Sequence, residues 1–151
     1  MLEHETGLMQ AFEVANVIVE NPSTKTLLFK ARMEEAKPGQ FVMAWLPGVG
    51  EKPFSIADAI PLALTVSDVG PVSHALTQLK PGEQVWIRGP LGQGYQLKGE
   101  KHLLVGGGYG VAPLAYLAKT ALKKGHQVSV CIGAKDAPGL LLERRLRGMG
   151  C

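Results

Sequence analysis

A change of pattern near residue 99 constrains the fold more than any other feature of the sequence. Before it, short runs rich in β-branched and aromatic residues alternate with turn signals, a spacing typical of a small antiparallel barrel or sandwich. After it, the order of strand, glycine loop, helix, strand and helix is typical of the start of a parallel α/β unit. The chain has 151 residues, enough for one domain and a piece of a second. We therefore expect a boundary near 98–101, between a domain over 1–98 and another over 99–151.

Turn signals divide each part into short elements. In the first part the pattern predicts strands over 11–20, 24–32, 41–46, 53–57, 62–67 and 84–88. A helix over 72–79 interrupts them, because Gly70-Pro71 marks its entry and Pro81-Gly82 marks its exit. In the second part we expect strands over 102–105 and 127–132, a glycine loop over 106–110, and helices over 113–124 and 140–147.

Composition excludes several classes of protein. Hydrophobic residues make up 46% of the chain and charged residues 19%, which favours a packed core over disorder. The net charge of +3 is too small to indicate nucleic acid as a partner. Residues 1–10 lack the apolar segment of a signal peptide. The longest apolar stretch, 103–118, is too short and too interrupted for a membrane span. We expect a cytoplasmic protein without membrane contact.

The side chains that bind metals are sparse. Cys131 and Cys151 cannot form a four-thiolate zinc or iron–sulfur site by themselves, and the four histidines lack metal-ligand spacing. Cys131 lies in an apolar strand, so we expect its thiol to be buried. The sequence therefore predicts no metal site of its own.

Glycine is concentrated in about one fifth of the chain, from Gly82 to Gly110. Nine of the 19 glycines fall in this stretch: Gly82, Gly89, Gly92, Gly94, Gly99, Gly106, Gly107, Gly108 and Gly110. Glycine spread evenly would suggest a loop-rich fold. Glycine gathered in this way indicates backbone that approaches another group closely.

The segment Lys52-Pro53-Phe54-Ser55 places a cation, a proline, an apolar ring and a hydroxyl at the start of a predicted strand. Proline fixes the backbone and gives up an N–H group. The hydroxyl and the neighbouring amides could then face a planar heterocycle. The alternative is an ordinary strand entry after a loop.

The segment Asp68-Val69-Gly70-Pro71-Val72-Ser73 leads into a predicted helix. Free amides at a helix N-terminus favour an anion such as phosphate, and Ser73 could add a hydroxyl. The alternative is that Ser73 only caps the helix.

The segment Gly89-Pro90-Leu91-Gly92-Gln93-Gly94-Tyr95 is typical of a tight, exposed turn. Tyr95 could stack on a ring, because aromatic faces suit planar ligands. The alternative is a long hairpin loop with a tyrosine in the core.

The glycine loop lies in Leu104-Val105-Gly106-Gly107-Gly108-Tyr109-Gly110-Val111-Ala112-Pro113-Leu114, after a strand and before a helix, which is the context of a dinucleotide-binding loop. Pro113 stands where the third glycine of that fingerprint would be, and no acidic residue ends the next strand. The glycines can still let a nicotinamide approach the backbone. The alternative is tight packing of the helix on the strand.

In this order, the segments K-P-F-S, G-P-V-S, G-P-L-G-Q-G-Y and G-G-G-Y-G-V-A-P-L resemble the ferredoxin–NADP reductase superfamily. Within it, the chain is similar to the electron-transfer subunits of NAD-dependent dihydroorotate dehydrogenase, from about residue 9 onward. The resemblance implies an antiparallel Greek-key FAD-binding barrel over 1–98 and the first part of a nicotinamide-nucleotide-binding α/β domain over 99–151. It also implies an oxidoreductase subunit of pyrimidine biosynthesis. Electrons would pass from NADH to FAD, through a [2Fe–2S] cluster, to a separate dihydroorotate dehydrogenase catalytic subunit.

The resemblance also assigns residues by position. The flavin motif matches Lys52, Pro53, Phe54 and Ser55. The segment that holds the FAD pyrophosphate matches Gly70, Val72 and Ser73. The nicotinamide loop matches Gly106, Gly107, Gly108, Gly110 and Pro113. None of these is a general acid or base, because the cofactor carries the chemistry of flavin hydride transfer.

The chain departs from the family at three points. The flavin motif usually begins with arginine, and lysine lacks its bidentate fork. The cluster cysteines of the family are absent, and the nicotinamide domain stops after its second helix. Two alternatives therefore stay open: another NAD(P)H oxidoreductase subunit of the superfamily, or a truncated flavin-binding protein without turnover.

Overall fold

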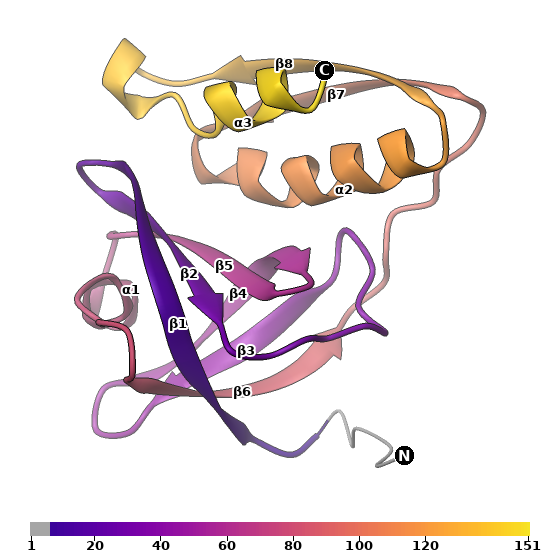
Figure 1. Ribbon diagram of the computed structural model, residues 1–151. Helices are drawn as coiled ribbons and strands as arrows, with labels where there is room; N and C mark the ends of the chain where they lie inside the picture. Colours follow the sequence, from indigo (N-terminus) through magenta and orange to yellow (C-terminus); the bar gives the residue numbers. More distant parts are fainter. Residues whose placement is uncertain (1–6) are drawn as a thin grey trace.

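The computed structural model describes residues 7–151, so His4, one of the four histidines expected not to bind a metal, lies outside the described residues. The first part is a closed six-stranded antiparallel barrel (Figure 1). Its strands are β1 (Gln10–Asn21), β2 (Thr24–Phe29), β3 (Phe41–Leu46), β4 (Gly50–Ala59), β5 (Leu62–Ser67) and β6 (Gln84–Leu91). Their order around the barrel, β1-β2-β5-β4-β3-β6, is a Greek key. The predicted fold class, a barrel followed by a short parallel α/β unit, is confirmed.

Alternating residues build the core of the barrel. In β3, Val42, Ala44 and Leu46 are buried and the residues between them are only half-buried, as expected of a strand with one face inward. β5 is buried on both faces, because Leu64 faces the barrel core and Ala63 packs under the α/β layer. The short helix α1 (Pro71–Thr77) adds Val72 and Leu76 to the same barrel core.

The second part is an α/β layer on top of the barrel (Figure 1). It contains β7 (Lys101–Gly107), a 3₁₀ turn (Gly108–Gly110), α2 (Val111–Lys123), β8 (Gln127–Gly133), a second 3₁₀ turn (Ala137–Gly139) and α3 (Glu143–Gly148). β7 and β8 pair in parallel. Figure 1 shows α2 between this two-stranded sheet and the barrel, and the helix contacts β4, β7 and β8. The predicted domain boundary near 98–101 stays a prediction.

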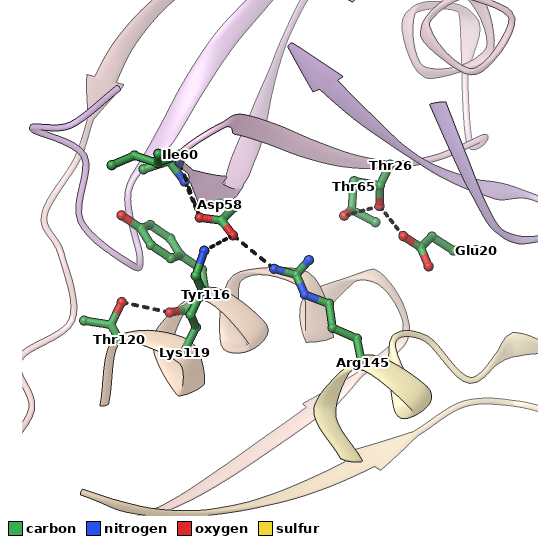
Figure 2. A network of polar contacts seen from close by, with 10 residues as sticks. Glu20, Thr26, Asp58, Ile60, Thr65, Tyr116, Lys119, Thr120 and Arg145 are labelled. Atoms are coloured by element: carbon green, nitrogen blue, oxygen red, sulfur yellow. Dashed lines mark hydrogen bonds and ion pairs between the residues drawn. The ribbon is translucent and has the colours of Figure 1, made fainter. Parts of the chain in front are cut away.

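A buried carboxylate joins the two parts (Figure 2). Asp58 of β4 is only 8% exposed. One carboxylate oxygen accepts hydrogen bonds from Lys119 of α2 at 2.6 Å and from Arg145 of α3 at 3.2 Å. The other oxygen accepts from the backbone N–H of Ala59 at 2.8 Å. Helices from outside the barrel are thus bound to one barrel side chain.

Tyr116 of α2 makes a second connection. Its hydroxyl donates to the carbonyl of Ala36 at 2.8 Å, and its ring packs in the barrel core. Burial raises the pKa of this hydroxyl, and the nearby negative charge of Asp58 adds to the rise. The phenol therefore stays protonated and keeps its hydrogen-bond donor over the physiological pH range.

Among the expectations that were wrong are the start of the last helix and the burial of Cys131. The helix expected over 140–147 begins at Glu143, because a 3₁₀ turn and a left-handed residue, Leu142, come first. Cys131 is exposed rather than buried. Its face of the β7–β8 sheet lies opposite α2 and is not covered by any described element, so Leu103 and Val105 on that face are also 66% and 70% exposed. Strand composition alone cannot tell a covered face from an open one.

Among residues 7–151, no helix is both long enough and apolar enough to cross a membrane. Within the same part of the chain, no three His, Cys, Asp or Glu side chains gather into a group that could hold a metal ion.

Candidate functional site

The candidate site lies where two neighbouring strands separate. Within the described chain, the ladder between β4 and β5 ends at the pair Ile56–Leu64. β4 runs back from there to Gly50 along β3, while β5 continues to Ser67 along β2. The first half of β4 and the second half of β5 therefore splay apart. A β-bulge in the ladder beside Ile56 is the kind of irregularity that bends a strand away from its partner.

A cavity of about 550 Å³ fills this gap. Its walls come from β4, β5, the entry to α1, the 3₁₀ turn before α2 and the start of α2: Lys52, Pro53, Phe54, Ser55, Thr65, Ser67, Val69, Gly70, Pro71, Val72, Ser73, Tyr109 and Ala112. Apolar groups dominate the walls, with a few hydroxyls and one cation. This size and lining are typical of a site for a small organic molecule.

The sequence-predicted flavin and phosphate segments meet in this cavity. All seven of their residues line it: Lys52, Pro53, Phe54, Ser55, Gly70, Val72 and Ser73. They come from two stretches of chain that are separated by 14 residues and by β5. The barrel topology thus brings together two segments that the sequence could only place in order.

Lys52 supplies positive charge that no neighbour neutralises. It is exposed, and among the described residues it has no ion pair, whereas Glu51 beside it binds Arg88 at 3.0 Å. Ser55 is likewise exposed, and its hydroxyl has no hydrogen-bond partner in the described chain. An unpaired ammonium and a free hydroxyl on an apolar wall suit a ligand with a flat ring and an anionic group.

The Ser73 hydroxyl forms hydrogen bonds with the backbone of the turn before α1. It accepts hydrogen bonds from the N–H groups of Val69 and Gly70 and donates to the carbonyl of Gly70, each at 3.0 Å. These contacts fix the turn that enters α1. Since α1 has only seven residues and Pro71 has no N–H, the charge at this helix end is small. Phosphate recognition here would depend on Lys52 more than on the helix.

Thr65 contributes an acceptor to the wall. Its hydroxyl shares a 2.9 Å hydrogen bond with Thr26, which itself donates to Glu20 at 2.6 Å (Figure 2). A hydroxyl has one hydrogen, so Thr26 must accept from Thr65. The Thr65 oxygen can therefore only accept from a ligand, which favours a ligand N–H or O–H opposite it.

The glycine loop reaches the cavity through only part of its length. Tyr109 and Ala112 line the cavity, whereas the predicted residues Gly106, Gly107, Gly108, Gly110 and Pro113 do not. Packing accounts for glycine at position 106, because a Cβ there would lie 2.7 Å from the Leu114 side chain. Gly108 has a φ of +53°, a conformation that glycine adopts without strain. The Cβ positions of Gly108 and Gly110 face open space, which leaves their backbone approachable.

Tyr95 does not line the cavity. Its backbone N–H donates to the carbonyl of Pro38 at 2.7 Å, and its ring lies over Gly39. The ring is 52% exposed, so it is not a core tyrosine either. The stacking role that the sequence suggested for Tyr95 therefore stays a prediction, and its ring lies outside this cavity.

Sequence reasoning missed two wall residues, Thr65 and Ser67, and named Val69, Pro71, Tyr109 and Ala112 only as members of longer segments. For Thr65 and Ser67, the available signal was the alternation of hydroxyl residues along β5 on the face that leaves the β4 ladder. For Tyr109, the available signal was a bulky aromatic residue between two glycines, in a loop whose other positions are mostly small.

No protein-family model matches the chain. Curated proteins from archaea are similar to the chain. The chain is 48% identical over 120 residues to the "Probable dihydroorotate dehydrogenase B (NAD(+)), electron transfer subunit" of Thermococcus kodakarensis, covering 78% of this chain and 49% of that protein. It is 38% identical over 140 residues to the protein of the same description from Methanocella arvoryzae, covering 91% and 53%. The chain thus spans about half the length of the curated relatives it matches.

Solved structures agree with the fold. The chain superposes on a chain of NADH-dependent reduced ferredoxin–NADP oxidoreductase with a TM-score of 0.83 and 27% identity, covering 95% of this chain and 55% of that one. It superposes on phthalate dioxygenase reductase with a TM-score of 0.79 and 16% identity, covering 91% and 47%. At 16% identity, the second match supports the fold and nothing beyond it.

Proposed function

We propose, from the homology of this chain to archaeal dihydroorotate dehydrogenase B electron transfer subunits over about half of their length, that it binds FAD between β4 and β5. The FAD would take electrons from NADH and pass them towards a dihydroorotate dehydrogenase catalytic subunit. The chain is related to subunits of flavin oxidoreductases. Its specific donor, acceptor and cytoplasmic setting are parts of the proposal.

One observation carries the FAD assignment. The cavity joins the K-P-F-S segment, the turn into α1, Tyr109 of the glycine loop and the start of α2 around one apolar volume with an unpaired cation. The isoalloxazine ring needs apolar walls and a few polar contacts, and the pyrophosphate needs positive charge and N–H donors. Lys52, Ser55 and Thr65 are of the right chemistry for these two parts.

The chain has two cysteines, one exposed and one half-buried, which cannot supply four thiolates. Its residues do not fit a [2Fe–2S] cluster, so the proposal for this chain includes none. FAD supplies the redox chemistry when bound, and the residues of the chain position the ring and exclude water from it.

Purified protein incubated with FAD and passed through a desalting column is expected to stay yellow and to show the two visible absorption bands of oxidised flavin. The measurement is the molar ratio of retained FAD to protein. FMN and riboflavin serve as matched ligands, and weaker retention of both is expected because each lacks the full pyrophosphate. A colourless protein at saturating FAD would contradict the proposal.

Substituting Lys52 tests the phosphate contact. Lys52→Ala is expected to weaken FAD binding about five- to tenfold, since an exposed charge-assisted contact contributes about 1 kcal/mol. Lys52→Arg is expected to bind FAD at least as tightly as the unmodified chain, because guanidinium binds phosphate through two hydrogen bonds. Isothermal titration with FAD measures both dissociation constants.

Lys124→Ala is the matched control for Lys52, because it removes the same charge from an exposed position at the end of α2. Equal losses of affinity in Lys52→Ala and Lys124→Ala would show a general charge effect and would remove Lys52 from the site.

A second candidate function stays open because the quoted segments are shared across the superfamily: a subunit of another NAD(P)H oxidoreductase of that superfamily. Reduction of an artificial electron acceptor by NADH tests turnover, and co-purification with a dihydroorotate dehydrogenase catalytic subunit tests the partner. Flavin binding without acceptor reduction would favour a binding protein over an oxidoreductase.

A further inference from the structure

We propose that Tyr109 lies in contact with the isoalloxazine ring and quenches its fluorescence. The inference rests on the proposed FAD binding, which it deepens by naming a residue that contacts the ring. Position, lack of competing contacts and loop geometry each support it.

The position of Tyr109 is the first argument. Its 3₁₀ turn lies against β5, the strand whose Thr65 and Ser67 form one wall of the cavity. Tyr109 lines the same cavity as Phe54 and Ser55, although more than 50 residues separate them in the sequence. It is the only aromatic residue that the α/β layer contributes to the cavity lining in the described chain.

The ring of Tyr109 has no other partner. It is 64% exposed, it makes no aromatic pair, and its hydroxyl has no hydrogen-bond partner among residues 7–151. By contrast, Tyr116 is buried and bonded to Ala36, and Tyr95 lies over Gly39. A large apolar face left open at a cavity wall gains by covering a flat ligand, because burial removes apolar area from water and aromatic rings stack favourably.

The loop leaves room for this contact. Gly108 and Gly110 flank Tyr109, and a Cβ at either position would meet nothing within 4 Å. The backbone on either side of Tyr109 therefore faces open space and leaves room for a ligand. The positive φ of Gly108 sets the turn that presents the ring.

Contact between a phenol and a flavin has an optical consequence. An excited flavin is a strong oxidant, so it takes one electron from a phenol ring in contact with it. The electron then returns to the phenol, and both groups end unchanged without emission of light. Phenylalanine has nearly the same shape but is far harder to oxidise, so it keeps the contact and removes the quenching.

The experiment compares the fluorescence yield and lifetime of FAD bound to the full chain and to four variants. Tyr109→Phe is expected to raise both several-fold with little change in FAD affinity. Tyr109→Trp is expected to stay quenched, because indole is also readily oxidised. Tyr109→Ala is expected to raise the yield and to weaken FAD binding. Tyr95→Phe is the matched control and is expected to change nothing.

The outcomes separate this inference from the proposed function. If FAD binds and Tyr109→Phe leaves the yield and lifetime of bound FAD unchanged, Tyr109 does not contact the ring and only this inference fails. If Tyr95→Phe restores fluorescence instead, the contact belongs to the other loop. If the unmodified chain binds no FAD, the proposed function and this inference fail together.

Discussion

Asp58→Ala is expected to lower the free energy of unfolding by about 2–3 kcal/mol, because removing one partner of a buried ion pair leaves the other charges uncompensated. Lys119 and Arg145 would both lose their carboxylate, and the N–H of Ala59 would lose its acceptor. The side chains of Lys119 and Arg145 are 29% and 33% exposed, so water relieves part of the penalty and the estimate lies below that for a fully buried pair. Urea denaturation measures the change.

Two variants serve as controls for Asp58. Asp58→Asn keeps an acceptor for the backbone and removes the charge, so it is expected to lose less stability than Asp58→Ala. Glu143→Ala breaks the exposed Glu143–Arg147 pair on α3 and is expected to cost about 0.5 kcal/mol or less. A loss in Glu143→Ala equal to that in Asp58→Ala would contradict a special role for the buried carboxylate.

Because Asp58 joins α2 and α3 to the barrel, its removal should affect the α/β layer more than the barrel. Amide hydrogen exchange is expected to quicken in α2 and α3 of Asp58→Ala while the barrel strands keep most of their protection. Uniform acceleration across the chain would show a general loss of stability instead.

Gly39→Ala is expected to lower the free energy of unfolding by about 2–4 kcal/mol, from backbone strain plus overpacking. Gly39 has a φ of +96°, and a Cβ there would lie 2.9 Å from both the ring and the backbone nitrogen of Tyr95. A side-chain end can move aside, but the nitrogen is held by its hydrogen bond to Pro38 at 2.7 Å. The segment that carries Tyr95 would have to shift. Urea or thermal denaturation measures the loss.

Gly82→Ala is the matched control, because Gly82 has the same φ of +96° but a Cβ there would meet nothing within 4 Å. It is expected to cost about 1–2 kcal/mol from the backbone alone. The difference between the two variants isolates the contact with Tyr95. Equal losses would mean that the packing of this loop on Gly39 contributes nothing to stability.

The short elements could be predicted because their signals are local. β3 and β5 have the bounds that their alternation and flanking turns predict, and Gly125 follows the end of α2 as expected. The errors concern where elements begin and end, and which face of a strand is covered. β2 ends at Phe29 rather than at residue 32, and α2 begins at Val111 rather than at residue 113. Pro113 is tolerated inside the first turn of α2 because the N–H groups there have no helical acceptor.

Only the part of the candidate site that has local sequence signals was predicted; the part that depends on how loops pack was not. Lys52 to Ser55 and the turn into α1 were found from residue types alone, since proline, glycine and hydroxyls leave clear local signals. Their binding roles stay predictions, as do those of the five loop residues that do not line the cavity. Tyr95 and Tyr109 are both tyrosines beside glycines, and only the packing of their loops tells which one reaches the cavity.

By itself the sequence determined the type of fold, the order of its segments and a resemblance to flavin-dependent electron carriers, because turn residues, alternation and glycine motifs are local properties of the chain. Only the tertiary structure decided where β4 leaves β5, that Tyr109 rather than Tyr95 faces the gap, and that one carboxylate, Asp58, binds two helices to the barrel. It also decided that Cys131 is exposed. These features depend on which surfaces meet, and contacts between residues far apart in the chain leave no periodic signal in the sequence.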